Sequence, residues 1–326
     1  MITICSVYHS SETKKLVEMN YGLTKKKNPG VDFSWVLAEN APEDLLDKMP
    51  RNGNFTVIPG PEGGLEKMYS IYPRWIASTF LHNGAMNMSI PHIKTRFGIF
   101  LDSDFYILEP NWIKKAIDHM QKNNLTFLGT PWHPKDYIKF RYFPCHQCLF
   151  VDFEKLKENG YKPEDIDFNP TGYGNSPGEP PKKRFGKLSR IINMFNFSER
   201  RKIGTDKHTA HGVFEKFHKD GKTKFKVIPA VFKPEKESYP ALNLVYIFNK
   251  FFEFFLPDKF CYIPKDTSYY STKSFKDRGY GEIFGEEFIW KDKPFAIHVR
   301  LQKKMQKGAT LPEIEAILNE LFQRFN

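Results

Sequence analysis

The chain has 326 residues, 49 of them lysine or arginine and 38 aspartate or glutamate, which gives a formal net charge of +11. Hydrophobic residues make up 40% of the sequence and aromatic residues 16%, which is enough for a sizeable core and excludes a disordered chain. The apolar stretches are shorter than the roughly 20 residues that cross a bilayer, so no transmembrane helix is expected.

Strands and helices are predicted to alternate through the first half of the chain. Strands are expected over residues 2–7, 33–38, 55–58 and 96–101, and a helix over 65–81 that Pro73 interrupts. A helix over 111–122 and strands over 125–129 and 147–153 follow. This alternation predicts an α/β layer with a largely parallel sheet.

A loop rich in glycine and proline over residues 169–181 is the best candidate for a boundary within the chain. Helices are expected over 187–197, 207–218 and 311–325, and residues 239–263 are crowded with aromatic side chains. We expect one α/β core over residues 1–235 and a helical and aromatic extension over 236–326.

The amino terminus and the cysteines indicate the cellular compartment of the protein. The first residues read as a strand and carry neither a basic region nor a cleavage pattern, so no signal peptide is expected. Four cysteines in a chain of this length do not make a disulfide scaffold. We expect a cytoplasmic protein, with peripheral contact to the inner membrane face left open.

Asp102-Ser103-Asp104 is the motif that carries chemistry. It directly follows the apolar run 97–101, which is typical of a buried strand at the centre of a sheet. Open α/β sheets bind ligands at the carboxyl ends of their strands, and two carboxylates there can face one hard cation. The alternative interpretation is a pair of aspartates that caps a turn.

An apolar strand ending in an Asp-x-Asp motif resembles the glycosyltransferases of the GT-A fold, and the resemblance covers most of the chain. It implies a Rossmann-like, mixed and mainly parallel sheet flanked by helices. It also implies a Mn²⁺ or Mg²⁺ ion held by Asp102, Asp104 and His298, the last from a late strand at 295–298. The nucleotide-binding residues that it implies are Tyr8, His9, Glu39, Asn40, Gly60, His82, Asn87, Asp102, Ser103 and Arg300. For His298 alone, an ordinary buried histidine is the alternative.

The resemblance implies transfer of a sugar from a nucleotide-sugar donor, with UDP-sugars expected first. The acceptor would be a glycan, a glycolipid or a protein. An inverting enzyme needs a carboxylate that takes the acceptor's proton, and we predict Asp206 for this role, with Asp136 and Asp167 as substitutes. Asp206 is alternatively a helix cap.

Residues 181–226 hold fourteen basic and four acidic residues, so nearly all the excess charge lies there. The segment is either a solvated basic face or a surface for anions such as a diphosphate. A nucleic-acid-binding protein is one rival function, and it leaves the Asp-x-Asp motif unexplained. A nucleotidyltransferase is the other, but it should carry a glycine-rich loop after the first strand, where Ser10 and Ser11 stand instead.

Two further patterns have mostly structural interpretations. Cys145 and Cys148 have the spacing of zinc ligands, but no second close pair accompanies them, so buried thiols are favoured. The aromatic tract 246–255 suits a buried helix or a homodimer contact, and alternatively a membrane surface.

Overall fold

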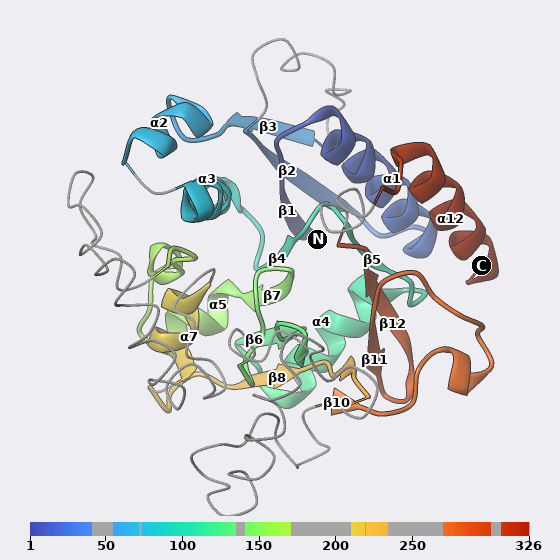
Figure 1. Ribbon diagram of the computed structural model, residues 1–326. Coiled ribbons are helices and arrows are strands. Elements are labelled where there is room, and N and C mark those ends of the chain that lie inside the picture. Colours follow the sequence, from blue (N-terminus) through green and yellow to red (C-terminus); the bar gives the residue numbers. More distant parts are fainter. Residues whose placement is uncertain are drawn as a thin grey trace, which may run out of the picture.

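The computed structural model describes residues 1–40, 55–71, 74–134, 141–170, 210–218, 220–233, 270–300 and 308–325. Within these residues the strands form a seven-stranded and a five-stranded sheet (Figure 1). The boundary expected at residues 235 and 236, the helix expected over 187–197 and the aromatic tract 246–255 lie outside the described residues.

The seven-stranded sheet is mixed and mainly parallel. Its strands, in spatial order, are β3 (Phe55–Pro59), β2 (Phe33–Glu39), β1 (Ile2–Tyr8), β4 (Phe97–Leu101), β7 (Cys148–Asp152), β6 (Phe127–Gly129) and β8 (Phe225–Val227). The block from β3 to β4 is parallel, as is the pair of β6 and β8, whereas β7 is antiparallel to both of its neighbours. The predicted sheet type is therefore confirmed.

Alternate residues of β1 point into two different cores, because side chains of a strand alternate between the faces of its sheet. Ile2 and Ile4 pack with residues of α1 (Ser11–Lys27) and α4 (Trp112–Asn123). Cys5 and Val7 pack on the other face with α3 (Arg74–Ser89), α5 (Phe153–Glu158) and α7 (His211–His218). Helices cover both faces, as predicted, and this explains why β4 is apolar and buried along its whole length.

The five-stranded sheet brings the carboxyl-terminal part of the chain to the Asp-x-Asp turn. Its order is β10 (Tyr270–Ser271), β9 (Ala230–Val231), β11 (Glu286–Trp290), β12 (Lys293–His298) and β5 (Phe105–Ile107). β12 is antiparallel to both β11 and β5, and His298 lies opposite Phe105. Because β5 begins directly after Asp104, this register places His298 beside the turn.

The remaining elements complete the layers. They are α2 (Gly64–Ile71), α12 (Leu311–Arg324) and the short 3-10 helices η2 (Ile90–His92), η4 (Pro163–Asp165) and η7 (Lys276–Arg278). The predicted helix over 65–81 is divided into α2 and α3 on either side of Pro73, and α12 confirms the predicted closing helix. Leu16 and Leu23 of α1 share a core with Ile314 and Leu318 of α12, and the two helices lie side by side in Figure 1. None of the helices described has the length and apolar character to span a membrane.

Replacement by alanine is expected to have opposite effects on stability at two glycines. A Cβ atom on Gly129 in β6 would lie 2.0 Å from the backbone oxygen of Cys148, whereas one on Gly22 in α1 would meet nothing within 4 Å. We expect Gly129→Ala to lower the free energy of unfolding by about 1–3 kcal/mol through overpacking. Gly22→Ala should raise it by about 0.5–1 kcal/mol, because alanine favours the helix. Urea unfolding measures both, and an unchanged midpoint for Gly129→Ala would contradict the packing described.

Candidate active site at the carboxyl end of strand β4

Backbone hydrogen bonds hold the turn that carries the two aspartates. The amide of Asp102 donates to the carbonyl oxygen of Gln147 at 3.1 Å, and the amide of Phe105 donates to that of Asp102 at 3.1 Å. The amide of Val299 donates to the carbonyl oxygen of Asp104 at 3.0 Å. The turn is thereby tied to β7 on one side and to the end of β12 on the other.

Asp102, Asp104 and His298 come together as the resemblance implied. His298 Nε2 lies 3.1 Å from Asp104 Oδ1 and 4.0 Å from Asp102 Oδ2. One ligand atom from each of the three residues lies within 4.8 Å of the others. One imidazole nitrogen and two carboxylate oxygens suit a divalent cation such as Mn²⁺, and three protein ligands leave positions open for other oxygens. The residues present therefore fit the implied ion.

Glu286 of β11 orients His298 from behind. Its Oε2 lies 3.1 Å from His298 Nδ1, and its carboxylate accepts hydrogen bonds of 2.9 Å from Arg300 Nε. An imidazole that donates from Nδ1 presents the lone pair of Nε2, which is the atom facing Asp104. Glu286 and His298 are both buried, so this carboxylate fixes the tautomer and the direction of the ring.

Arg300, predicted to bind the nucleotide, contacts Glu286 and Trp132. Its Nε is committed to Glu286, and its guanidinium lies 4.7 Å from the centre of the Trp132 ring. The Arg300 backbone has a φ of 57°, in the left-handed region. Trp132 is buried and stacks on this guanidinium, which explains its position.

Electrostatic attraction between carboxylates and imidazoles shifts the pKa values of His298 and Asp102. Burial lowers the pKa of His298, but the charge of Asp104 and the hydrogen bonds with Asp104 and Glu286 together raise the pKa to about 9. Burial raises the pKa of Asp102, yet His146, His82 and His298 together hold it well below its usual range. At neutral pH the metal-free protein therefore holds ionised Asp102 and protonated His298, and a cation has to displace the proton on His298.

The raised pKa of His298 predicts a pH dependence of metal binding. Below pH 9 the cation competes with the proton, so Mn²⁺ affinity should rise about tenfold per pH unit from pH 7 and level off above pH 9. Titrations of Mn²⁺ at several pH values, followed by electron paramagnetic resonance, measure this slope. His298→Gln removes the titrating group and should flatten it, whereas an equal slope in that variant would contradict the assignment.

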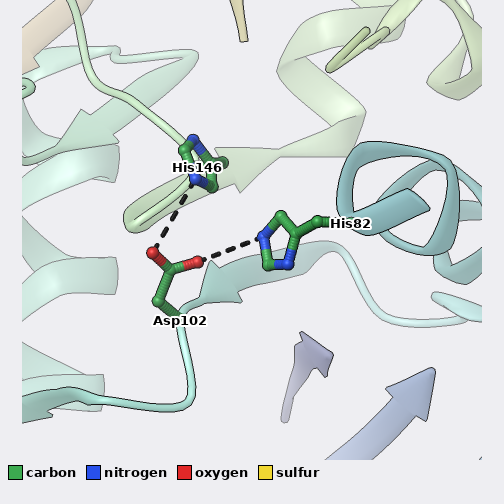
Figure 2. A group of neighbouring side chains, drawn as sticks. All are labelled: His82, Asp102 and His146. Atoms are coloured by element: carbon green, nitrogen blue, oxygen red, sulfur yellow. Dashed lines mark ion pairs between the residues drawn. The ribbon is translucent and has the colours of Figure 1, made fainter. Parts of the chain in front are cut away.

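Two more imidazoles surround Asp102 (Figure 2). His82 of α3 places Nε2 3.4 Å from Asp102 Oδ1, and His146, just before β7, places Nε2 3.7 Å from Oδ2. Burial lowers the pKa of His146 to about 3, so this ring is neutral at ordinary pH. The sequence predicts His82 as a site residue but not His146, because the spacing within the Cys145–Cys148 segment points to its thiols. The two thiols, like that of Cys5, are free and buried, which agrees with the structural interpretation.

Most of the other predicted nucleotide-binding residues follow the neighbouring strands at the same edge of the sheet. Tyr8 ends β1, and its hydroxyl donates to the carboxylate of Glu39 at the end of β2. The amide of Asn40 donates to the carbonyl oxygen of Tyr8 at 2.8 Å, and that of Gly60 to Glu39 at 2.7 Å. A Cβ on Gly60 would lie 2.6 Å from the backbone oxygen of Glu39, so glycine is required for this close approach. Ser103 lies buried between the two aspartates.

His9 and Asn87 have different surroundings. His9 follows β1. Desolvation and the nearby His82 lower the pKa of its ring, against the opposite effect of Asp104 and Asp102. It therefore lies within electrostatic reach of the turn. The side chain of Asn87 instead donates to Asp167 at 2.7 Å and accepts from the amide of Phe168 at 3.0 Å. Asp206 and Asp136 lie outside the described residues.

Comparison with known proteins gives structural neighbours only. No protein-family model matches the sequence, and a search of curated proteins gave no match. Glycosyltransferases are among the similar solved structures. A mannosyltransferase from Pyrobaculum calidifontis, solved with GDP-Man and Mn²⁺, has 11% identity and a TM-score of 0.35, with 51% of this chain and 48% of that chain covered. Mouse xyloside xylosyltransferase 1 has 10% identity and a TM-score of 0.35, with 70% and 86% covered.

S. aureus TarS (residues 1–349) is a further neighbour, also solved with UDP-GlcNAc and with UDP. It has 15% identity and a TM-score of 0.36, and the match covers 59% of this chain and 54% of that chain. This chain thus spans about half the length of the TarS structure that it matches. The overlap with each neighbour is partial, so a functional assignment depends on the geometry of the site.

Proposed function

We propose that this protein is a glycosyltransferase that moves a sugar from a nucleoside diphosphate sugar to an acceptor, with a divalent cation bound by Asp102, Asp104 and His298. The observation that carries the proposal is the convergence of these three side chains at the carboxyl end of β4, with His298 Nε2 3.1 Å from Asp104. Ligands bind at this end of the strands in open α/β sheets.

The chemistry of such a transfer fits the ligand set. Breaking the bond between sugar and diphosphate leaves negative charge on the departing phosphate oxygens, and a bound cation supplies the stabilisation of that charge. Glu286 keeps His298 in the ligating tautomer through Nδ1, and Arg300 holds Glu286 in turn. Both residues thus act on the position of a ligand and not on the sugar.

The nucleoside would lie along the ends of β1 and β2. Tyr8, Glu39 and Asn40 are joined there by the hydroxyl–carboxylate contact and by the hydrogen bond from Asn40 to Tyr8. A carboxylate and an amide at a strand end are suited to the hydroxyls of a ribose or the edge of a base. Asp206 remains our proposed base, and a glycan, glycolipid or protein our proposed class of acceptor.

A metal-dependent transferase is favoured over the nucleotidyltransferase by the segment after β1. Helix α1 begins at Ser11, and its amino terminus is capped from within: the side chain of Ser10 accepts from the Thr13 amide, and that of Thr13 accepts from the Ser10 amide. No glycine stands in the residues that join β1 to α1. A phosphate-binding loop of the glycine-rich type therefore has no counterpart at this place.

Calorimetric titration of UDP and GDP with and without Mn²⁺ tests the proposal. These two nucleotides are chosen because they are parts of the donors in the TarS and mannosyltransferase structures. We expect at least one of them to bind more tightly when Mn²⁺ is present. Equal or absent binding of both nucleotides under the two conditions would contradict the proposal.

A further inference from the structure

A second group of side chains that could hold a metal ion shares Asp102 with the Asp102–Asp104–His298 site. This group, the His82–Asp102–His146 cluster, draws one residue each from α3, from the turn after β4 and from the segment before β7 (Figure 2). In Figure 2 each imidazole points toward a different oxygen of the carboxylate. Three separate elements thus converge on one point.

The spacing within the cluster matches that of metal ligands. His82 Nε2 lies 3.4 Å from Asp102 Oδ1, His146 Nε2 lies 3.7 Å from Oδ2, and one ligand atom of each residue lies within 4.8 Å of the others. Zinc bonds to nitrogen and oxygen of about 2.0–2.2 Å in a tetrahedron separate two ligand atoms by roughly 3.4 Å. The cluster is therefore near the required spacing with little movement of its side chains.

Two of these atoms lack well-formed hydrogen bonds. His82 Nε2 and Asp102 Oδ1 are buried and face each other at 3.4 Å, which is longer than a usual hydrogen bond, and neither has a better partner among the described residues. His146, whose side chain is only 4% exposed, directs Nε2 toward Asp102, and its Nδ1 has no partner within the described part of the chain. Burying a polar atom without a partner destabilises the folded protein, so the facing pair of His82 and Asp102 indicates a missing ligand.

The chemistry of the donors selects the kind of ligand. Two imidazoles and one carboxylate favour borderline transition metals such as Zn²⁺ over Mg²⁺ or Ca²⁺, which prefer oxygen. Asp102 borders both groups of ligands, because its Oδ1 faces His82 and its Oδ2 lies 3.7 Å from His146 and 4.0 Å from His298. Carboxylates commonly belong to both halves of two-metal sites for phosphate chemistry.

We propose that the His82–Asp102–His146 cluster binds a second divalent cation of the zinc class, with Asp102 shared between it and the Asp102–Asp104–His298 site. Three protein ligands leave at least one position open, which would take an oxygen of water, hydroxyl or phosphate. The proposal concerns metal binding alone and does not depend on sugar transfer.

Metal counting on the whole chain tests it. Metal-free protein is dialysed to equilibrium against Zn²⁺, and bound zinc is counted by mass spectrometry. We expect two ions per wild-type chain, one in His82→Gln, one in His146→Gln and one in His298→Gln. His92→Gln, which changes an exposed histidine in η2, is the matched control and should keep two. Circular dichroism of each variant checks folding, and His82→Gln is the milder change, because its side chain is 24% exposed.

A visible spectrum of the Co²⁺-loaded protein gives an independent reading of the same site. The His298→Gln variant should keep the absorption of Co²⁺ bound to imidazole, and adding His82→Gln to it should abolish that absorption. One zinc ion in the wild type that is lost in His298→Gln and kept in His82→Gln would overturn the proposal. Equal zinc content in all variants would overturn it too, since the metal would then be bound elsewhere.

Discussion

Replacing Asp104 by asparagine is expected to weaken Mn²⁺ binding by about 100-fold or more and to remove any metal-dependent binding of nucleotide. The substitution deletes the charged oxygen that faces His298 Nε2 at 3.1 Å. It keeps the size of the side chain and leaves the backbone bond from Val299 to residue 104 in place. The loss of metal affinity should therefore come without a change in the backbone of the turn.

Electron paramagnetic resonance of Mn²⁺, together with calorimetric titration of nucleotide, measures the effect of Asp104→Asn. Asp118→Asn is the matched control, because Asp118 is an exposed residue of α4 paired only with Lys114 in the structure described. The control should bind metal and nucleotide as the wild type does. If Asp104→Asn bound Mn²⁺ with wild-type affinity, Asp104 would not be a ligand of the metal.

Replacing Glu286 by glutamine should lower metal affinity by about 10- to 100-fold, although Glu286 is not among the proposed ligands. The change removes the charge that holds His298 Nδ1 at 3.1 Å and that accepts two hydrogen bonds from Arg300 Nε. His298 should also lose part of the stabilisation of its protonated form, because its hydrogen bond with Glu286 raises its pKa. The pKa of His298 is therefore expected to fall in the variant.

These two effects can be separated by pH. Proton competition at His298 disappears above pH 9, so a difference in Mn²⁺ affinity that remains there reports orientation of the ring. Nuclear magnetic resonance titration of the imidazole follows the pKa itself. Glu282→Gln, which changes an exposed carboxylate paired with Lys276, is the control. Unchanged affinity above pH 9 together with an unchanged pKa would contradict the positioning role of Glu286.

The central motif could be predicted because its signal is local. An apolar run followed by Asp102 and Asp104 predicts a buried strand that ends in a polar turn, and β4 and the turn after it have this form. His298 is predicted from the resemblance alone, in which residues 295–298 match a late strand. The structure places it beside Asp104 because β12 pairs with β5, a contact between segments nearly two hundred residues apart, as the hydrogen bond at that separation shows.

Glu286 and His146 could not be found in the same way. Glu286 reaches His298 only through the antiparallel pairing of β11 with β12, in which these two residues are partners. Nothing in the sequence around Glu286 distinguishes it from the neighbouring Glu287. His146 is brought to Asp102 by the pairing of β7 with β4, where Cys148 lies opposite Leu101. Short strands such as β9 and β10, with two residues each, are too brief to show a hydrophobic period.

Hydrolysis of nucleotide sugars tests the central claim most directly, because water can take the place of the acceptor when none is present. The measurement is the release of nucleoside diphosphate from a set of UDP- and GDP-sugars by the wild-type protein, with Mn²⁺ and with a chelator. We predict release from at least one donor that requires the cation and is lost in Asp104→Asn. Release that persists equally in the chelator and in the variant would contradict the account.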